Sequence, residues 1–356
     1  LNFPTRKAGT FSIWGLGLLD RNKAEVLDRS EWETMGDRSS GSNKLDKLAG
    51  GLTHKYVINE NTYIRSSLSA TYSKDHSLVN LQTDDGTIVQ VGDIQNSRWN
   101  FVFNSYLNKK FSSRHTNRTG ITITELKYDL DYKVSPYFGL NQPMEQLSKG
   151  SGESTVLSAY SSSVINLSNN LTTSLGVTGQ YFTLNKNSIE PRVALKWEIN
   201  PAHSLAVAYG LHSHRERLDY YFVEQIINGK KESNRYLDFS KAHHFGFTYD
   251  WNINQSLHLK IEPYYQYLFH IPVEQNSSFS IINYEEFYLD RILTSTGTAK
   301  NYGIDITLEQ YMKNGFYYMI TGSLFKSKYR GGDRIWRNTR LDKSYLVNLL
   351  AGKEWM

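Results

Sequence analysis

Apolar and polar side chains alternate with a period of two along most of this chain, and no other feature restricts its fold as strongly. The alternation is clearest in residues 190–199. There the two faces are formed by Pro191, Val193, Leu195, Trp197 and Ile199, and by Glu190, Arg192, Ala194, Lys196 and Glu198. A β-strand points successive side chains to opposite faces, so this segment predicts a strand with one apolar and one charged face.

The same pattern predicts about fourteen strands of about 10–16 residues, longer than the usual strands of soluble sheets. They cover residues 11–19, 45–57, 62–72, 97–111, 119–133, 153–166, 171–183, 190–199, 204–211, 244–251, 257–267, 302–309, 316–324 and 343–356. Between Ile123 and Leu126 the alternation changes phase, which predicts a β-bulge. A membrane strand tilted by about 45° needs roughly 9–11 residues to cross the hydrocarbon, so these lengths favour a transmembrane barrel.

The connections between the predicted strands alternate between short and long, with one brief exception near 184–188. The short ones are 59–62, 112–115, 168–170, 200–203, 252–255 and 313–315, and the long ones are 20–44, 73–96, 134–152, 212–239, 271–298 and 328–342. Outer-membrane barrels have short periplasmic turns and long extracellular loops. On this reading strand 11–19 runs outward and segment 343–356 runs inward.

Alternation alone does not distinguish a membrane barrel from a soluble β-sandwich, in which the apolar face forms the core. Charged side chains of the clearest strands all lie opposite the apolar face, where a Lys or Arg would cost roughly 2–4 kcal/mol at the bilayer midplane. Aromatic residues near strand ends predict girdles at the two bilayer interfaces: Trp14, Tyr56, Tyr72, Trp99, Tyr181, Trp197 and Trp251. Both features favour the barrel, with a soluble β-rich adhesin as the alternative.

Composition excludes several other classes. No apolar run reaches the ~18 residues that a spanning helix needs, which excludes a helical membrane protein. The chain of 356 residues has no cysteine, which excludes a disulfide scaffold, zinc fingers and thiol catalysis. The net charge is only +5 and no block of five or more like charges occurs, so nucleic acid is not an expected partner.

Several segments carry a family likeness. Residues 188–192 and 205–213 resemble the barrel of TonB-dependent outer-membrane receptors, most closely the subgroup with a carboxypeptidase-regulatory-like domain ahead of the plug. Further segments of the same pattern are 239–244, 273–274, 297–303, 328–333, 338–340 and 348–355, and residues 9–17 are the best match in the first half. The likeness is strongest from Ser188 onward.

The resemblance implies an all-β fold: an antiparallel transmembrane β-barrel of which this chain forms about 14 of 22 strands. Residues 1–356 are then one domain, an interior part of the barrel without the plug and the terminal strands. Open strand edges are not tolerated in hydrocarbon, so this part alone is expected neither to insert nor to transport.

The resemblance also implies a function. In the intact family, a ligand bound outside loosens the plug, and an inner-membrane complex pulls on an N-terminal box to open a path. We therefore expect active uptake of a scarce ligand (siderophore, cobalamin, peptide or glycan) across the outer membrane of a Gram-negative bacterium. The implied partners are outer-membrane lipid, the protein's own plug, the TonB complex acting on the absent N-terminal region, an extracellular small ligand and a surface lipoprotein. A barrel that binds a surface partner and a passive porin are the alternatives.

No catalytic constellation is recognisable, and we predict neither an enzyme nor a cofactor nor a metal site. Candidate ligand-binding residues lie in the predicted extracellular loops: His212, His214, Arg215, Tyr220, Tyr221, Arg235, Arg334 and Trp336. Guanidinium and aromatic groups suit anionic or sugar-like ligands. Candidate plug-facing residues of the lumen are Glu190, Arg192, Lys196, Glu198, Lys260, Glu262, Asp305 and Glu309.

Each candidate has a structural alternative. His212, His214 and Glu216 could contact a metal or heme, or simply be the polar end of a strand. The arginines of 328–342 could bind ligand or lie beside anionic lipopolysaccharide. The Glu190–Arg192 and Lys196–Glu198 neighbours could be a salt-bridge ladder against the plug, or a path for protons or substrate. His243 and His244 point to opposite faces of a strand and cannot share one ion.

Overall fold

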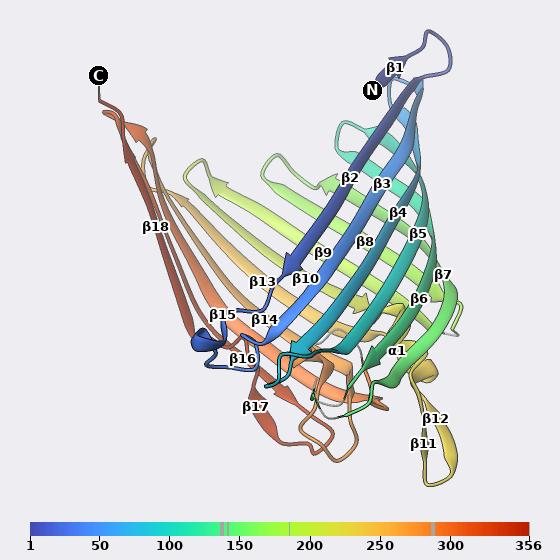
Figure 1. Cartoon of the computed structure of the whole chain (residues 1–356). Coiled ribbons are helices and arrows are strands. Elements are labelled where there is room, and N and C mark those ends of the chain that lie inside the picture. Colours follow the sequence, from blue (N-terminus) through green and yellow to red (C-terminus); the bar gives the residue numbers. More distant parts are fainter. Residues whose placement is uncertain (136–138, 141, 185, 286–288, 356) are drawn as a thin grey trace.

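A single antiparallel sheet contains most of the chain. The computed structural model describes residues 1–135, 139–140, 142–184, 186–285 and 289–355 (Figure 1). The long strands are β2 (Thr10–Ala24), β3 (Ser39–Asn59), β4 (Thr62–Gln82), β5 (Ile88–Ser112), β6 (His115–Val134), β7 (Glu145–Asn166), β8 (Leu171–Phe182), β9 (Lys186–Asn200), β10 (His203–His214), β13 (Ser240–Asn252), β14 (Leu257–Val273), β15 (Thr294–Lys313), β16 (Phe316–Arg330) and β18 (Tyr345–Lys353).

Short elements complete the described part of the chain. The strands β1 (Asn2–Pro4) and β17 (Trp336–Asn338) join the sheet, whereas β11 (Glu224–Ile227) and β12 (Lys230–Ser233) form a separate hairpin. The helices are α1 (Leu218–Tyr221) and the 3₁₀ turns η1 (Arg29–Glu31), η3 (Asn234–Tyr236) and η4 (Ile281–Asn283). No helix among the described residues is long and apolar enough to cross a bilayer.

Each long strand pairs with its neighbour in the chain, so the sheet is a continuous antiparallel meander. It runs in order from β1 through β10, then β13 to β16, with β17 and β18 both pairing β16. Figure 1 shows the sheet curving into an open cylinder. Among the described residues, β2 and β18 do not pair with each other. The predicted partial antiparallel barrel is confirmed.

Strand register gathers the apolar side chains on the outer face. Leu52 lies opposite Leu68, Leu68 opposite Phe103, and Phe103 opposite Ile123. The same face continues through Leu195 and Val207 to Phe247. No second layer covers it in the described part of the chain: Leu195, Trp197, Phe247 and Ile306 are 37%, 45%, 38% and 40% exposed. Residues of a sandwich core would be buried, so the fold differs from the soluble alternative.

Several strands are longer than the sequence predicts. The segment 73–96, expected to be a long loop, is mostly sheet: β4 extends to Gln82 and β5 begins at Ile88. The extensions have polar residues on both faces, including the outer-face pair Lys74 and Ser97, so they carry no clear amphipathic pattern. They nevertheless continue the backbone hydrogen bonds of the hairpin. The expected alternation of short and long connections is therefore wrong at 83–87.

The bulge predicted between Ile123 and Leu126 is absent. Pairing of β6 with β5 and β7 is regular through this stretch, and its irregularities lie near Ser112 and Lys133. The phase of the apolar pattern changes because the apolar face itself changes. Ile121 and Ile123 point outward, whereas four later residues are buried on the inner face: Leu126, Tyr128, Leu130 and Tyr132.

The aromatic residues predicted to form girdles lie on the outer face of the sheet, with one exception. Tyr72 packs on Trp99 with ring centroids 4.4 Å apart. Both lie about ten residues or more from the tight turns next to Thr62 and Ser112, which is about the length of strand that crosses the hydrocarbon. Trp14 is the exception, because it lies opposite Gly51 on the inner face and covers that glycine. A Cβ on residue 51 would lie 2.9 Å from the indole nitrogen of Trp14. Trp14 therefore does not belong to a girdle.

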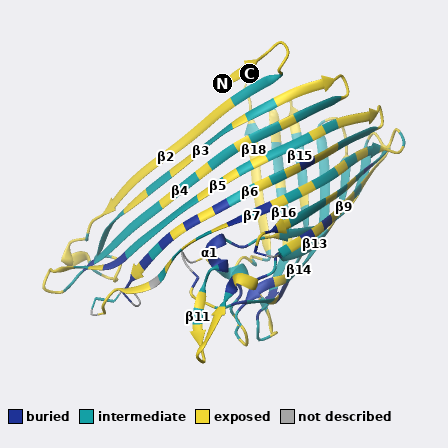
Figure 2. Cartoon of the chain, turned by 90° about the vertical axis from the view of Figure 1, so that its right-hand side faces the viewer, coloured by how far each residue is buried: buried dark blue, intermediate teal, exposed yellow. Residues whose placement is uncertain are grey.

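The two ends of the sheet differ. Tight turns join β3 to β4, β5 to β6 and β9 to β10 at one end, and α1, the β11–β12 hairpin and β17 lie at the other (Figure 1). Figure 2 shows that buried residues gather around α1, where the connections fold against the sheet. Any specialised site is therefore expected at this loop end.

Candidate functional site

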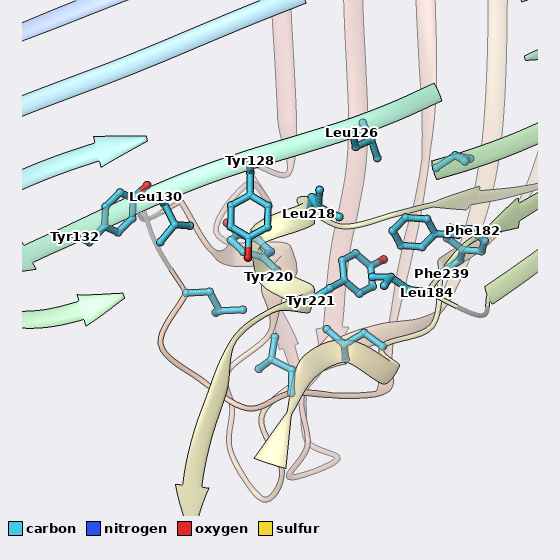
Figure 3. Packing of buried hydrophobic residues seen from close by; sticks show 14 residues of the cluster. Leu126, Tyr128, Leu130, Tyr132, Phe182, Leu184, Leu218, Tyr220, Tyr221 and Phe239 are labelled. Atoms are coloured by element: carbon cyan, nitrogen blue, oxygen red, sulfur yellow. The ribbon is translucent and has the colours of Figure 1, made fainter. Parts of the chain in front are cut away.

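The connection between β10 and β13 folds back onto the inner face of the sheet. Leu218, Tyr220 and Tyr221 of α1 are buried against the inner face of β6 and the end of β8 (Figure 3). The ring of Tyr221 meets that of Phe182 edge to face, with centroids 5.2 Å apart. This loop, residues 215–239, therefore forms a packed cap over part of the mouth of the barrel.

This packing corrects two of the predicted ligand contacts. Tyr220 and Tyr221 were expected on an exposed loop, but Tyr221 is fully buried and Tyr220 nearly so. Their partners include Leu289 and Leu293 of the next long connection. The two tyrosines thus help to hold the cap in place, and their rings are not exposed as expected. The sequence does not reveal this burial, because it depends on four apolar residues of β6 that face the bore, where polar residues are expected.

An ion cluster reinforces the cap. Arg98, on the inner face of β5, places Nη2 3.4 Å from Oδ1 of Asp219, and Nη2 of Arg217 lies 2.8 Å from Oδ2 of the same carboxylate. The side chain of Asp219 is only 6% exposed. Two guanidinium groups therefore flank one buried carboxylate, and the ion pair with Arg98 joins the loop to the barrel wall.

Beside the cap lies a cavity of about 400 Å³ between β10, β13 and the loop that carries η4. Its polar wall contains His212, His214, His244 and Glu216, and its apolar wall contains Leu268, Ile271, Ile281 and Ile282. The rings of His212 and His244 lie 4.6 Å apart. The cavity offers hydrogen-bonding groups on one side and hydrocarbon on the other, an arrangement suited to a small amphipathic ligand.

His244 is the residue of this cavity that sequence reasoning missed. Gly210 pairs with His244 and His212 pairs with Ala242, so the two histidines are diagonal neighbours on the inner face. Their proximity depends on the register between β10 and β13. The sequence carries one signal, because His244 falls on the polar face of a predicted strand and His212 continues the polar face of the strand predicted at 204–211. The long loop between those strands leaves their pairing unspecified.

Glu216 is buried at the edge of the cavity. Ser240 Oγ donates a hydrogen bond to its Oε1 at 2.8 Å, and its backbone N–H donates to the hydroxyl of Tyr221. Burial raises the pKa of Glu216, although the bond from Ser240 and the charge of His214 oppose this shift. Burial likewise raises the pKa of Tyr221. The described residues include no group of three or more His, Asp or Glu placed to hold a metal ion.

Glu216 is expected to make the cap pH-dependent. Its raised pKa means that the folded cap holds this proton more tightly than the unfolded cap, so the stabilisation is complete below the ordinary pKa and is lost as pH rises through the raised one. Hydrogen exchange of residues 215–239, corrected for intrinsic rates, should show easier opening at about pH 8 than at about pH 5. Glu216→Gln should remove this difference. Equal pH dependence in both proteins would refute the assignment.

Predicted lumen charges all lie on the inner face. Glu190 is buried and accepts from Arg192 Nη2 at 2.8 Å, from Gln180 Nε2 at 2.6 Å and from the hydroxyl of Ser213. Further ion pairs join Lys196 to Glu198 at 3.1 Å and Lys260 to Glu262 at 2.7 Å. Asp305 lies opposite Glu262 and Glu309 opposite His258. The predicted ladder of charges is present, whereas contact with a plug stays a prediction.

The remaining predicted ligand residues are scattered. Arg215 lies beside the cavity residue Glu216 and donates to its backbone carbonyl at 3.3 Å. Arg235 is exposed and stacks over Phe222. Arg334 lies in an exposed turn with φ of 61°. Trp336 pairs opposite Arg330 at the outer rim, so the structure does not bring Arg334 and Trp336 to the cavity of His212 and His214.

Comparison with known proteins gives matches by structure alone. No protein-family model and no curated protein sequence matches the chain. Among solved structures, it is similar to the outer membrane transporter YddB from Escherichia coli, with a TM-score of 0.67 and 12% identity over 98% of this chain and 53% of that one. The FrpB iron transporter from Neisseria meningitidis has a TM-score of 0.67 and 11% identity over 96% of this chain and 53% of FrpB.

The ferric-catecholate import receptor Fiu from E. coli K12 also has a TM-score of 0.67, with 11% identity over 98% of this chain and 60% of Fiu. The chain thus spans little more than half the length of the solved structures that it matches. The likeness covers almost all of the present sheet. It says nothing of the carboxypeptidase-regulatory-like subgroup, which stays a prediction. The chain has the β-barrel fold of TonB-dependent outer-membrane transporters, as the resemblance in its sequence predicts.

Proposed function

We propose that this chain is the barrel portion of an outer-membrane receptor that takes up a scarce small ligand with energy supplied from the inner membrane. The observation that carries the proposal is the apolar outer face, which stays exposed from β3 to β18 while charged groups line the inner face. Exposed apolar surface of this extent suits lipid. In this proposal the protein acts by binding its ligand and letting it pass.

In this proposal the charges of the inner face contact a plug. Glu190, Arg192, Lys196 and Glu198 form paired charges on one wall, with Lys260 and Glu262 on a neighbouring one. A plug domain of the same protein would lie against these pairs, and the TonB complex would act on it from the periplasm. Ligand enters from the opposite end, past the cap and the cavity of His212 and His244.

A second function is favoured by one observation. The β11–β12 hairpin projects away from the sheet at the loop end (Figure 1), and Ile226 of β11, opposite Lys231, is 79% exposed. An exposed apolar side chain on a projecting hairpin suits contact with a surface partner such as a lipoprotein. In that case binding of the partner would be the main role and transport secondary.

Growth of a deletion strain tests the proposal. We expect the strain to lose growth when a single ligand class supplies an essential nutrient: ferric siderophores, cobalamin, peptides or oligosaccharides, each offered at limiting concentration. Complementation with the full-length protein should restore growth, and a protonophore should abolish uptake. Uptake that persists with the protonophore would indicate a passive porin. Unchanged growth on every ligand would contradict a transport role.

The cavity histidines are expected to contribute to ligand uptake. Alanine at both His212 and His244 removes two hydrogen-bonding groups, each worth about 1 kcal/mol. The ligand concentration that gives half-maximal uptake should therefore rise roughly tenfold or more. His258→Ala is the matched control, because His258 is also on the inner face but pairs with Asp250 near the turn end. The measurement is the uptake kinetics of the double variant and of the control, in cells with equal receptor abundance. Equal effects of both changes would remove the cavity from the proposal.

The present chain in isolation is expected to remain unstable in detergent. Among the described residues, the edge of β18 and the edge of β2 beyond Ile13 are unpaired and expose backbone N–H and C=O groups, which hydrocarbon does not tolerate. Residues 1–356 refolded into detergent should therefore give neither a monodisperse species nor a heat-dependent shift in gel mobility. The full-length protein treated in parallel should give both. A stable, heat-modifiable barrel from residues 1–356 would contradict the view that these residues are an interior part of a larger barrel.

A further inference from the structure

We infer that the outer face of β15, β16 and β17 binds the phosphate-bearing headgroup of a lipid in the outer leaflet. The inference rests on the proposed function in one respect, namely that this face lies in a membrane. Its site is a group of four residues at the loop end, called here the outer basic patch: Lys300, Lys328, Arg330 and Trp336.

Register places the outer basic patch directly beyond the apolar band. On the outer face, Ile306 is opposite Gly322 and Ile304 is opposite Leu324, both within the band. The next outward pair is Tyr302 with Lys326, and the one after it is Lys300 with Lys328. Side chains thus change from aliphatic to aromatic to cationic along the strands. Hydrocarbon, interface and headgroups follow one another in that order in a bilayer leaflet.

The cations of the patch lack a carboxylate partner among the described residues. Nearby acids are already paired: Asp342 with Lys326 at 3.7 Å, Asp333 with Arg337 at 2.6 Å, and Glu285 with Arg340 at 2.6 Å. Lys300 and Lys328 lie directly opposite each other, and like charges in this position destabilise a sheet. A bound anion would relieve this repulsion.

Trp336 organises the patch. Lys300 Nζ lies 4.7 Å from the centroid of its ring and the guanidinium carbon of Arg330 lies 5.6 Å from it. The ring holds the two cations near each other, and both Lys300 and Arg330 are half-buried rather than fully covered. Contact with the ring does not neutralise the cations, and the N–H donors of Arg330 suit two oxygens of one phosphate.

The rest of the outer rim is different. Beyond the apolar band of β2 to β7, three cations pair with acids on the neighbouring strand: Arg21 with Asp46, His76 with Asp93 and Lys127 with Glu153. Lys44 and Lys74 lie on the same face, opposite His76 and Asp46, and form no ion pair among the described residues. The outer basic patch differs from this rim in that none of its three cations has a carboxylate partner among the described residues and two of them share one aromatic ring. Because the patch continues from Ile304 and Leu324, an anion bound there would have hydrocarbon directly beneath it. This favours a lipid over free phosphate.

Native mass spectrometry of the full-length protein in detergent tests the inference, with bisphosphorylated lipid A as the probe. We expect a triple variant, Lys300→Gln, Lys328→Gln and Arg330→Gln, to bind lipid A at least tenfold more weakly than the wild type. The matched control is Arg21→Gln, Lys74→Gln and Lys127→Gln, which removes the same charge from the outer face of other strands and should bind as the wild type does. Dephosphorylated lipid A should bind the wild type at least tenfold more weakly.

Two further measurements separate the outcomes. Lys328→Gln alone relieves a repulsive pair and should fold, as a heat-dependent gel shift would verify, yet still bind lipid A several-fold more weakly. Millimolar inorganic phosphate should not displace lipid A. Unchanged binding by a folded triple or single variant would overturn the inference, as would displacement by phosphate. Uptake assays on the same variants should match the wild type, so loss of transport and loss of lipid binding are distinguishable.

Discussion

Replacing Tyr221 with alanine should release the cap from the barrel wall. The side chain is fully buried and packs against Phe182, so its loss leaves a cavity that the surrounding residues fill only partly. Large-to-small changes of this kind cost about 3–5 kcal/mol. Hydrogen exchange of residues 215–239 in the full-length protein should accelerate by about two orders of magnitude or more, while the strands keep their protection.

Tyr236→Ala is the matched control for this experiment. Tyr236 belongs to the same loop but is 77% exposed, so its truncation should leave exchange unchanged. Limited proteolysis provides a second measurement, because a released cap should be cut between β10 and β13. Resistance of the Tyr221→Ala protein equal to that of the wild type would mean that the loop does not depend on this core.

The substitution Phe247→Arg should destabilise the full-length protein in lipid far more than the substitution Thr248→Arg. The two residues are adjacent in β13 and point to opposite faces. Phe247 lies opposite Val207 on the outer face, whereas Thr248 donates to Glu262 on the inner face. A cation near the bilayer midplane costs roughly 2–4 kcal/mol, while the guanidinium introduced by Thr248→Arg would meet a carboxylate in the bore.

Denaturant unfolding of the protein reconstituted in bilayers measures this difference. Phe247→Arg should lower the free energy of unfolding by at least 2–4 kcal/mol, roughly the cost of the cation together with the lost packing. Thr248→Arg should change it by about 1 kcal/mol or less. Equal losses at the two positions would show that the faces are not in different solvents.

The sequence predicts the sheet well where the two faces of a strand contact different environments, one apolar and one polar. In residues 190–199 and 244–251 each outer residue is apolar or aromatic and each inner residue is polar or small, so both the strands and their faces are readable. The prediction becomes poorer where both faces contact water, as in the extension of β4 past Tyr72, because polar side chains then occur on both faces.

The candidate site is only partly predictable because it depends on contacts distant in sequence. The spacing of His212 and His214 identifies them, but His244 joins them only through the register of β10 and β13. The burial of Tyr221 is not predicted because a buried tyrosine and an exposed one look alike in a loop sequence. The inner-face residues Leu126 and Tyr128 carry the missing signal, but the phase change that they cause is equally typical of a bulge.

Site-directed spin labelling of β13 tests the central claim most directly, namely that alternate side chains face lipid and the bore. The chain has no cysteine, so single cysteines introduced at positions 244–250 of the full-length protein provide specific labelling sites in this segment. In bilayers, labels at 245, 247 and 249 should be accessible to oxygen and shielded from a water-soluble nickel complex. Labels at 246, 248 and 250 should show weaker oxygen accessibility. A profile without this period of two, or full access of the nickel complex to 245, 247 and 249, would contradict the account.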